Sequence, residues 1–183
     1  NNLDSYNFSL ASESLQQFTR DEFADWYLEI AKVEKNKDEI LLYILQNILK
    51  LWHPFTPFMT EEIWHHLGDN KMLMIETWPK SEFKIDEKSI VGSQQIQALI
   101  VAIRNLRAKN KIEPAKKIEV TLISKENYNL IELQQEIIKN LARVDKLNII
   151  KSGDKPKNNV STVVSGVEIY ISLAGIIDIE AET

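Results

Sequence analysis

His53-Pro-Phe-Thr-Pro-Phe-Met-Thr-Glu-Glu-Ile-Trp64 is the stretch that decides the fold of this chain of 183 residues. Neither proline in it can lie inside a helix without removing a backbone hydrogen bond and clashing with the preceding turn. The helix before it must therefore end near Trp52 or His53, and Thr60 is expected to cap the helix that follows. Large apolar side chains crowd the stretch: Phe55, Phe58, Met59, Ile63 and Trp64. An exposed loop rarely carries so many, so we expect a corner that is buried between the helices of a bundle.

Two helical segments are predicted before the helix that leads into this corner. Residues 9–17 form the first, and the Thr19-x-x-Glu22 pattern of a capping box predicts a new helix, or a kink in a continuous one, directly after it. The second segment has an apolar stripe at helical spacing, formed by Phe23, Trp26, Tyr27 and Ile30. Another face repeats this spacing with mixed side chains, namely Asp25, Leu28, Glu29 and Lys32.

The helix that leads into the corner is expected over residues 39–52, with Asp38 as its cap. It is apolar around most of its circumference, which predicts the central and nearly surrounded helix of the bundle. After the corner, residues 61–67 are expected to form a short helix that ends at Gly68. Residues 72–78 are then expected to run extended.

The remainder of the chain predicts a smaller α/β module. Residues 80–92 lose hydrophobic periodicity and gain charge, which indicates a linker and a boundary near Gly92. The expected domains are therefore a helical bundle over 1–79 and an α/β subdomain over 93–183. The elements predicted in the second are a helix with an apolar stripe from Ile96 to Leu106, a strand over 117–123, a helix over 127–144, a strand over 147–150 and a hairpin of 160–164 with 167–171. The fold class is thus mainly α with a smaller α/β part.

Charge is unevenly divided along the chain. The net charge is −5, but residues 1–92 carry 9 Lys and Arg against 16 Asp and Glu, whereas residues 93–183 carry 13 against 11. The basic run of the second part opposes only Glu113 and consists of Arg104, Arg107, Lys109, Lys111, Lys116 and Lys117. Contacts with phosphates are therefore expected there. The alternative interpretation is an ordinary solvated helix face.

Several classes of function find no support in the sequence. The absence of cysteine excludes disulfides and thiolate metal sites, and the five scattered glycines cannot build a phosphate-binding loop. His65 and His66 follow Glu61 and Glu62 on one helix, which offers too few ligands to predict a metal site. No apolar run reaches the roughly 18 residues that cross a bilayer, and no secretion signal is present, so a cytoplasmic location is expected. We predict no catalytic residue.

The corner sequence resembles the helix-corner signature in the anticodon-binding domain of class I aminoacyl-tRNA synthetases for branched aliphatic amino acids. Asp25-Trp-Tyr-Leu-Glu29 and Leu173-Ala-Gly-Ile-Ile-Asp-Ile-Glu180 resemble the valyl family in particular. The resemblance implies a part of an enzyme that joins valine to tRNA(Val) with ATP and magnesium. The family's His-x-Gly-His and Lys-Met-Ser-Lys-Ser motifs do not occur here, so we expect neither aminoacylation nor a cofactor in this segment itself. The resemblance also implies a first bundle helix upstream of Asn1 and a coiled coil that begins after Thr183.

The same resemblance assigns roles to individual residues. Leu28 and Glu29 fall where anticodon bases are contacted, with Asp25 and Lys32 beside them. Glu29 would read a base, because a carboxylate accepts from the cytosine N4 amine and valine anticodons end in adenine-cytosine, while Leu28 would pack against a base. The alternative is that these are solvated helix charges.

The basic run resembles the family's Arg-x-x-Arg and Pro-x-x-Lys elements. It would contact the tRNA backbone or the catalytic domain of the same polypeptide through Arg104, Arg107, Lys109, Lys111 and Lys116. Arg107 could equally be a structural tether to the bundle. Two other functions stay open at this point: the corresponding domain of an isoleucyl or leucyl enzyme, and a structural domain that binds protein and no RNA. The expected partner is tRNA(Val), and the expected state is a monomer.

Overall fold

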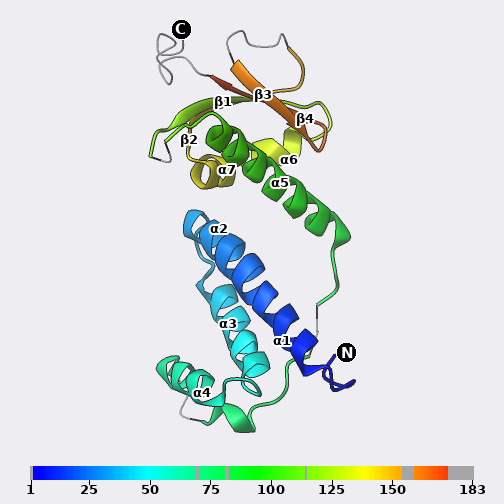
Figure 1. Cartoon of the computed structure of the whole chain (residues 1–183), viewed down its shortest axis with the longest axis vertical. Helices are drawn as coiled ribbons and strands as arrows, with labels where there is room; N and C mark the ends of the chain where they lie inside the picture. The colour runs from blue at the N-terminus through cyan, green and yellow to red at the C-terminus, as the bar shows by residue number, and fades with distance from the viewer. Residues whose placement is uncertain (1, 69–70, 81–82, 114, 154–158, 173–183) are drawn as a thin grey trace. The chain divides into compact units, whose positions relative to one another are not determined.

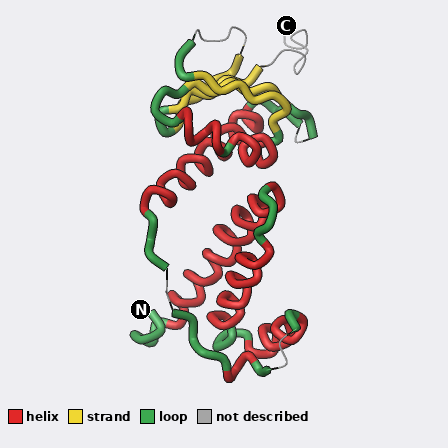
Figure 2. The backbone as a smooth tube through the Cα atoms, turned by 180° about the vertical axis from the view of Figure 1, so that it is seen from behind, coloured by secondary structure: helices red, strands yellow, loops and turns green. Residues whose placement is uncertain are grey.

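The computed structural model describes residues 2–68, 71–80, 83–113, 115–153 and 159–172. Two compact units divide the chain, unit 1 over residues 1–84 and unit 2 over residues 85–183. Unit 1 consists of helices, whereas unit 2 combines helices with a four-stranded sheet (Figures 1 and 2). The predicted class, mainly α with a smaller α/β part, is confirmed. The block Leu173–Glu180 and the expected coiled-coil start lie outside the described residues.

A continuous helical run opens unit 1. It comprises α1 (Phe8–Gln17), a π-helical segment η1 (Phe18–Tyr27) and α2 (Leu28–Val33), and the residues at both junctions keep helical backbone angles. The expectation of a capping box was therefore wrong, and its alternative, a continuous helix with an irregularity, is what forms. The Thr19 hydroxyl donates to the Leu15 carbonyl oxygen at 2.7 Å, a bond back along the helix that capping geometry would not allow.

Helix α3 (Asp38–Trp52) packs against α1 but is not the surrounded helix that its composition predicted. Only Ile48 and Leu49 are buried along it, while Ile40, Leu42 and Tyr43 are exposed. The cap assigned to Asp38 was wrong, because Asp38 is the first helical residue and Lys37 occupies the N-cap position. The apolar residues around α3 could all be buried, but only those that face a neighbouring element of unit 1 are.

The proline corner turns α3 into α4 (Pro57–His66). Pro57 occupies the first turn of α4, where its missing N–H costs nothing. The helix therefore starts earlier than predicted, and the cap assigned to Thr60 was wrong because that residue lies within the helix. Gly68, with φ +88°, donates its N–H to the His65 carbonyl oxygen and ends the helix as expected.

The expectation of a buried corner is only partly right. Trp64 is 2% exposed and packs with Leu49 and Leu73, but Phe58 is 92% exposed, and Met59 and Ile63 also face solvent. Because α4 begins at Pro57, Phe58 and Met59 are first-turn residues of this helix, and both side chains are exposed. Beyond the corner, the short helix η2 (Leu73–Ile75) replaces part of the predicted extended stretch.

Unit 2 begins with α5 (Glu87–Lys109), so residues 87–92 are helical and do not belong to a linker. The Asp86 carboxylate caps this helix by accepting from the backbone N–H groups of Lys88 and Ser89. Gly92 suggested a boundary because glycine disfavours helix interiors by about 1 kcal/mol relative to alanine. In the fold it lies inside α5, where a Cβ would stand 3.6 Å from the Leu130 side chain.

The sheet of unit 2 has the strand order β2-β1-β4-β3. β1 (Ile118–Ile123) pairs in parallel with β2 (Val144–Ile150), and β4 (Val167–Ser172) pairs antiparallel with both β1 and β3 (Asn159–Val164). The predicted hairpin is confirmed, with Ser165 and Gly166 at positive φ in its turn. The helix expected over 127–144 is divided into α6 (Tyr128–Leu133) and α7 (Gln135–Ala142). Helices α5, α6 and α7 lie on one face of the sheet (Figures 1 and 2).

Candidate nucleic-acid interface

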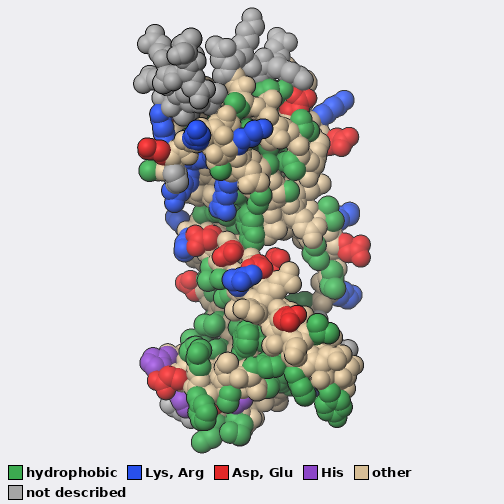
Figure 3. Space-filling view, in the orientation of Figure 1, with side chains coloured by type: hydrophobic (Ala, Val, Ile, Leu, Met, Phe, Trp, Pro, Cys, Tyr) green, Lys and Arg blue, Asp and Glu red, His purple; other side chains and the backbone are tan. Residues whose placement is uncertain are grey.

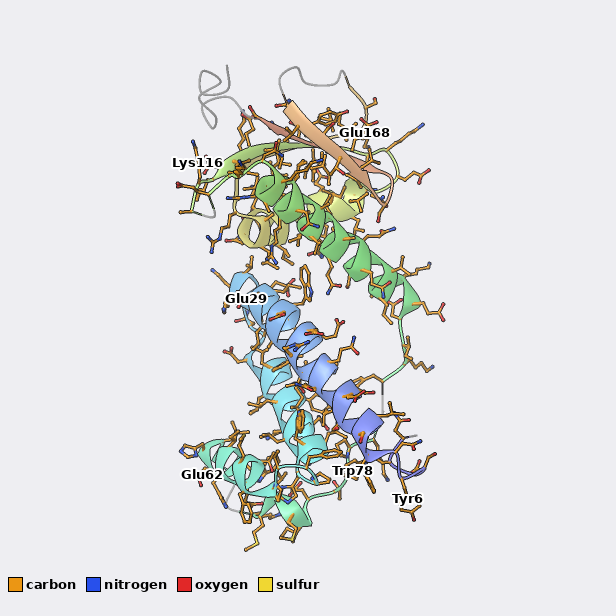
Figure 4. The ribbon with its side chains drawn as sticks, viewed as in Figure 1. Tyr6, Glu29, Glu62, Trp78, Lys116 and Glu168 are labelled. Carbon is orange, nitrogen blue, oxygen red and sulfur yellow. The ribbon has the colours of Figure 1, made fainter. Side chains whose placement is uncertain are left out.

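The residues that the sequence singled out as base readers lie where the first helical run of unit 1 ends. Asp25 belongs to η1, and Leu28, Glu29 and Lys32 belong to α2. Asp25 and Lys32 are exposed, whereas Leu28 and Glu29 are half-buried. Figure 4 labels Glu29 at this end of unit 1 and Glu62, on the corner helix α4, at the other. The proline corner and the proposed reading surface therefore lie at different ends of unit 1.

The π-helical segment decides how these side chains are presented. The Leu28 N–H donates to the Phe23 carbonyl oxygen, five residues earlier, and ordinary α-helix resumes only from Leu28. Such segments are frequent at functional sites, because they rotate the following residues relative to a regular helix. On the inner side, Phe23 is buried and its ring stacks on Tyr27 with centroids 6.3 Å apart. The predicted stripe is thus anchored at Phe23, while Trp26, Tyr27 and Ile30 are half-buried.

Glu29 is ion-paired in the free chain. Lys32 Nζ lies 2.5 Å from Glu29 Oε1, and the two side chains are 67% and 45% exposed respectively. A pair this exposed contributes about 0–1 kcal/mol. Exchanging the ammonium group for another donor therefore costs little, so the carboxylate is available to a ligand with an amine or amide hydrogen.

Arg107, the second member of the predicted basic run, is 5% exposed and engaged in the fold. Its guanidinium donates to the carbonyl oxygens of Ala142 and Arg143, both at 2.9 Å, and to those of Glu113 at 3.0 Å and Lys116 at 2.6 Å. Burial, and secondarily the charge of Arg143, lowers the pKa of Arg107 below its ordinary value. The tether interpretation is closest, with the difference that these four hydrogen bonds join parts of unit 2 to one another. This geometry gives no support to a phosphate contact by Arg107.

The other basic residues surround the same end of α5. Arg104 is exposed and donates through Nε and Nη2 to the Leu141 carbonyl oxygen, at 2.9 and 2.8 Å. Lys109, Lys111 and Lys116 are exposed at the end of α5 and in the loop that leads to β1. Lys and Arg side chains gather along this flank of unit 2 (Figure 3), and Figure 4 labels Lys116 there.

Sequence reasoning missed Arg143. It ends α7 in the left-handed conformation, with φ 54° and ψ 49°, and it lines a hollow of about 340 Å³ together with Arg104 and Arg107. No local pattern identifies it, because it lies 36 residues from Arg107 and only the crossover from β1 to β2 brings the two together. Pro114 is the proline of the segment that resembles the family's Pro-x-x-Lys element, and it lies outside the described residues.

His65 and His66 each lie near a glutamate one turn earlier on α4. His65 Nε2 lies 3.5 Å from Glu61 Oε1, and His66 Nδ1 lies 3.7 Å from Glu62 Oε1. Within the described ranges, no three His, Asp or Glu side chains are placed to hold a metal ion together. None of the described helices combines the length and apolarity needed to cross a membrane.

Comparison with known sequences identifies the family of this chain. The family described as the anticodon-binding domain of tRNA ligases matches residues 1–122, which include all of unit 1, α5 and most of β1. The chain belongs to this family. The anticodon-binding domain is also 32% identical over 193 residues to a valine–tRNA ligase of Halalkalibacterium halodurans, covering 98% of this chain. It is 34% identical over 194 residues to a valine–tRNA ligase of Clostridium acetobutylicum, covering 99% of this chain.

The domain spans 22% of the length of each of these two relatives. Both relatives are named as ligases, and the match with the family is to its anticodon-binding region. Among the described residues, α2 presents the Glu29 carboxylate, a hydrogen-bond acceptor, and the basic flank of unit 2 presents exposed cations.

Proposed function

We propose that this anticodon-binding domain is part of a valine–tRNA ligase and holds the anticodon end of tRNA(Val). The names of the two relatives, and their match along nearly the whole chain, support valine as the amino acid. In this proposal a catalytic domain of the same polypeptide uses ATP and magnesium to activate valine, and the enzyme acts as a cytoplasmic monomer. The task of the domain is to fix the tRNA so that its acceptor end reaches that active site.

Glu29 is the proposed base reader. Unpaired anticodon bases are recognised by unstacking them, packing them on apolar groups and bonding to their Watson–Crick edges. Leu28, half-buried at the start of α2, would support a base, and the Glu29 carboxylate would accept from the N4 amine of cytosine. Lys32 would then leave Glu29 and face a neighbouring phosphate, with Asp25 at the edge of the contact. The open and easily exchanged Glu29–Lys32 pair is the observation that carries this proposal.

Glu29→Gln in the full-length ligase tests the reader. We expect kcat/KM for tRNA(Val) to fall about 10- to 100-fold, the scale of one base contact worth about 1–3 kcal/mol, with valine activation by ATP unchanged. Glu34→Gln is the matched control, because Glu34 is also ion-paired, to Lys37 at 3.1 Å, but follows α2. Normal charging by Glu29→Gln at limiting tRNA would remove Glu29 from the interface.

Transcripts with exchanged anticodons separate the related enzymes. A valine enzyme should bind a transcript with the valine anticodon more tightly than one with an isoleucine or leucine anticodon, and Glu29→Gln should reduce that preference. In the same proposal, Arg104, Lys109, Lys111 and Lys116 contact the tRNA backbone without reading sequence, since contacts with phosphate carry position and not base identity. Equal affinity for all three transcripts would count against decoding by this domain.

A further inference from the structure

The corner helix α4 and the segment that follows it carry an exposed apolar surface. Its six members are large hydrophobic side chains that are 37–92% exposed, and we call them the corner patch: Phe58, Met59 and Ile63 of α4, with Met72, Met74 and Ile75 at η2. Figure 3 shows hydrophobic side chains beside the histidines at this end of unit 1. Proteins that act alone rarely leave such a surface in water, and exposed apolar patches commonly mark contacts with another surface.

Buried contacts hold the two parts of the corner patch together. Trp64 of α4 and Leu73 of η2 are 2% and 3% exposed and pack in one core with Leu49 of α3. The Glu61 carboxylate accepts the Leu73 backbone N–H at 2.9 Å, which joins η2 to α4 by a hydrogen bond as well. The exposed side chains therefore stand on elements that are anchored from beneath. A surface held in this way loses little conformational freedom when another surface covers it.

The charge around the corner patch does not suit a nucleic acid. Residues 51–70 contain three acidic side chains and no Lys or Arg. Lys50, the nearest cation before this stretch, pairs with Glu76 at 3.1 Å, and Lys71 is the first cation after it. Binding to the phosphates of tRNA requires several cations on one surface. The corner patch therefore fits an apolar surface of a protein, whereas the exposed cations of unit 2 fit tRNA.

The length of the relatives indicates which protein surface is at hand. The chain spans 22% of each relative, so more than three quarters of each relative lies outside the matched region. A surface on the same polypeptide has a high effective concentration, so a small patch can be covered without the affinity that a separate partner would need. We propose that the corner patch docks on an apolar surface of the catalytic domain in the same polypeptide. This inference rests on the proposed function and names the surface by which the anticodon-binding domain is held.

The accessibility of thiols in the full-length ligase tests the docking. This chain contains no cysteine, so Phe58→Cys and Ile75→Cys each place a single thiol in it, whose peptide mass spectrometry can identify. We expect N-ethylmaleimide to alkylate each thiol at least about 10-fold more slowly in the native ligase than in urea, because a covered side chain reacts only when the contact opens. Leu133→Cys is the matched control. Leu133 is also apolar and 78% exposed but lies in unit 2, and its two rates should be similar.

A second substitution links the two parts of the patch. Phe58→Asp, added to Ile75→Cys, should restore rapid alkylation, because a carboxylate in an apolar contact opposes its closure. Phe58 is 92% exposed in this chain, so the change should not unfold unit 1. Slow alkylation that persists in this double variant would show that Ile75 is covered by something other than this contact, and would overturn the docking.

The other outcomes separate the docking from its rivals and from the proposed function. Rapid alkylation of Phe58→Cys and Ile75→Cys in a ligase that charges tRNA(Val) normally would overturn the docking and leave the proposed function standing. Protection that requires added tRNA would assign the patch to RNA, and protection that increases with the enzyme concentration would assign it to a second copy; either result would also overturn the docking. A full-length polypeptide that charges no tRNA would refute the proposed function, and this inference with it.

Discussion

The two units of this domain close their cores to different degrees. Of the buried apolar residues described, five lie in unit 1 and nineteen in unit 2, where Ile100, Ile103, Ile138, Ile169 and Ile171 are wholly inaccessible. Large exposed apolar residues show the reverse distribution, with fifteen in unit 1 and six in unit 2. Hydrophobic side chains accordingly gather on the surface of unit 1 in Figure 3. A sheet covered by helices buries one whole face, whereas a pair of helices buries only one stripe of each.

Polar contacts supply part of what the core of unit 1 lacks. The Trp52 indole N–H donates to the Thr19 hydroxyl at 3.0 Å, and His53 Nδ1 lies 2.8 Å from the Thr60 hydroxyl. Lys50 pairs with Glu76 at 3.1 Å and lies over the Trp64 ring. These bonds tie α3 to η1, α4 and the segment after η2. The helices of unit 1 are therefore aligned by hydrogen bonds and ion pairs, which are directional. Their arrangement depends on fewer and more specific residues than the apolar core of unit 2.

Ile103→Ala should produce the largest effect and should act on unit 2 alone. Ile103 is fully buried in α5, and its truncation should lower the free energy of unfolding by about 2–5 kcal/mol. All four tryptophans lie in unit 1, so their fluorescence follows that unit, while the β-sheet signal in circular dichroism follows unit 2. Ile40→Ala, at a position 46% exposed in α3, is the control and should cost about 1 kcal/mol. If Ile103→Ala shifted the unfolding transitions seen by fluorescence and by circular dichroism equally, the two units would unfold as one, and their cores could not be compared separately.

Thr60→Val should have an intermediate effect, confined to unit 1. It keeps the shape of the side chain but removes the hydroxyl that bonds to His53 and to the Thr56 and Pro57 carbonyl oxygens. We expect a loss of about 1–2 kcal/mol in urea unfolding followed by tryptophan fluorescence, because Thr60 is buried and its partners lose a bond. Phe58→Ala, two residues earlier and 92% exposed, should stay within about 0.5 kcal/mol. A larger loss for Phe58→Ala than for Thr60→Val would show that apolar contacts dominate the corner.

The pH dependence of unit 2 should show the smallest effect, through Asp86. The side-chain bond from Ser89, followed by its backbone N–H, lowers the pKa of Asp86 in the folded chain. A lowered folded pKa means that the contribution is present above the ordinary pKa of about 3.9 and is lost as the pH falls through the folded value. Asp86→Asn can still cap α5 but does not titrate. The urea-unfolding midpoints of the unaltered protein and of Asp86→Asn, followed by circular dichroism, should therefore differ at pH 6. The difference should become smaller as the pH is lowered. Tryptophan fluorescence, which follows unit 1, should show no such trend.

Elements with a strong local signal were predictable. The proline corner, the helix stop at Gly68 and the hairpin turn at Ser165-Gly166 form as expected, because each follows from backbone restrictions of the residues present. The π-helical segment was not predictable, since its spacing departs from the period that sequence analysis assumes. The exposure of Ile40 and Phe58 was also missed, because burial depends on neighbours and not on hydrophobicity alone.

The candidate sites were predictable to different extents. Asp25, Leu28, Glu29 and Lys32 could be proposed from the sequence because they are neighbours on one segment that resembles the valyl family, and their role in binding RNA stays a prediction. Their ion pairing and exposure came from the fold. The burial of Arg107 could not be predicted, because two of its four carbonyl partners, Ala142 and Arg143, lie 35 and 36 residues away in the sequence. Arg143 was missed for the same reason.

The sequence by itself determined the family, the helical corner at the prolines and the types of residue available to bind RNA. Each of these depends only on residues that are neighbours in the sequence. The tertiary structure alone decided that Arg107 is buried while Arg104 and Arg143, which line the same hollow, are exposed. It also decided which apolar faces stay uncovered. The physical reason is that burial and electrostatic balance are sums over groups brought together by folding, and the α5–α7 contact joins residues separated by some 36 positions.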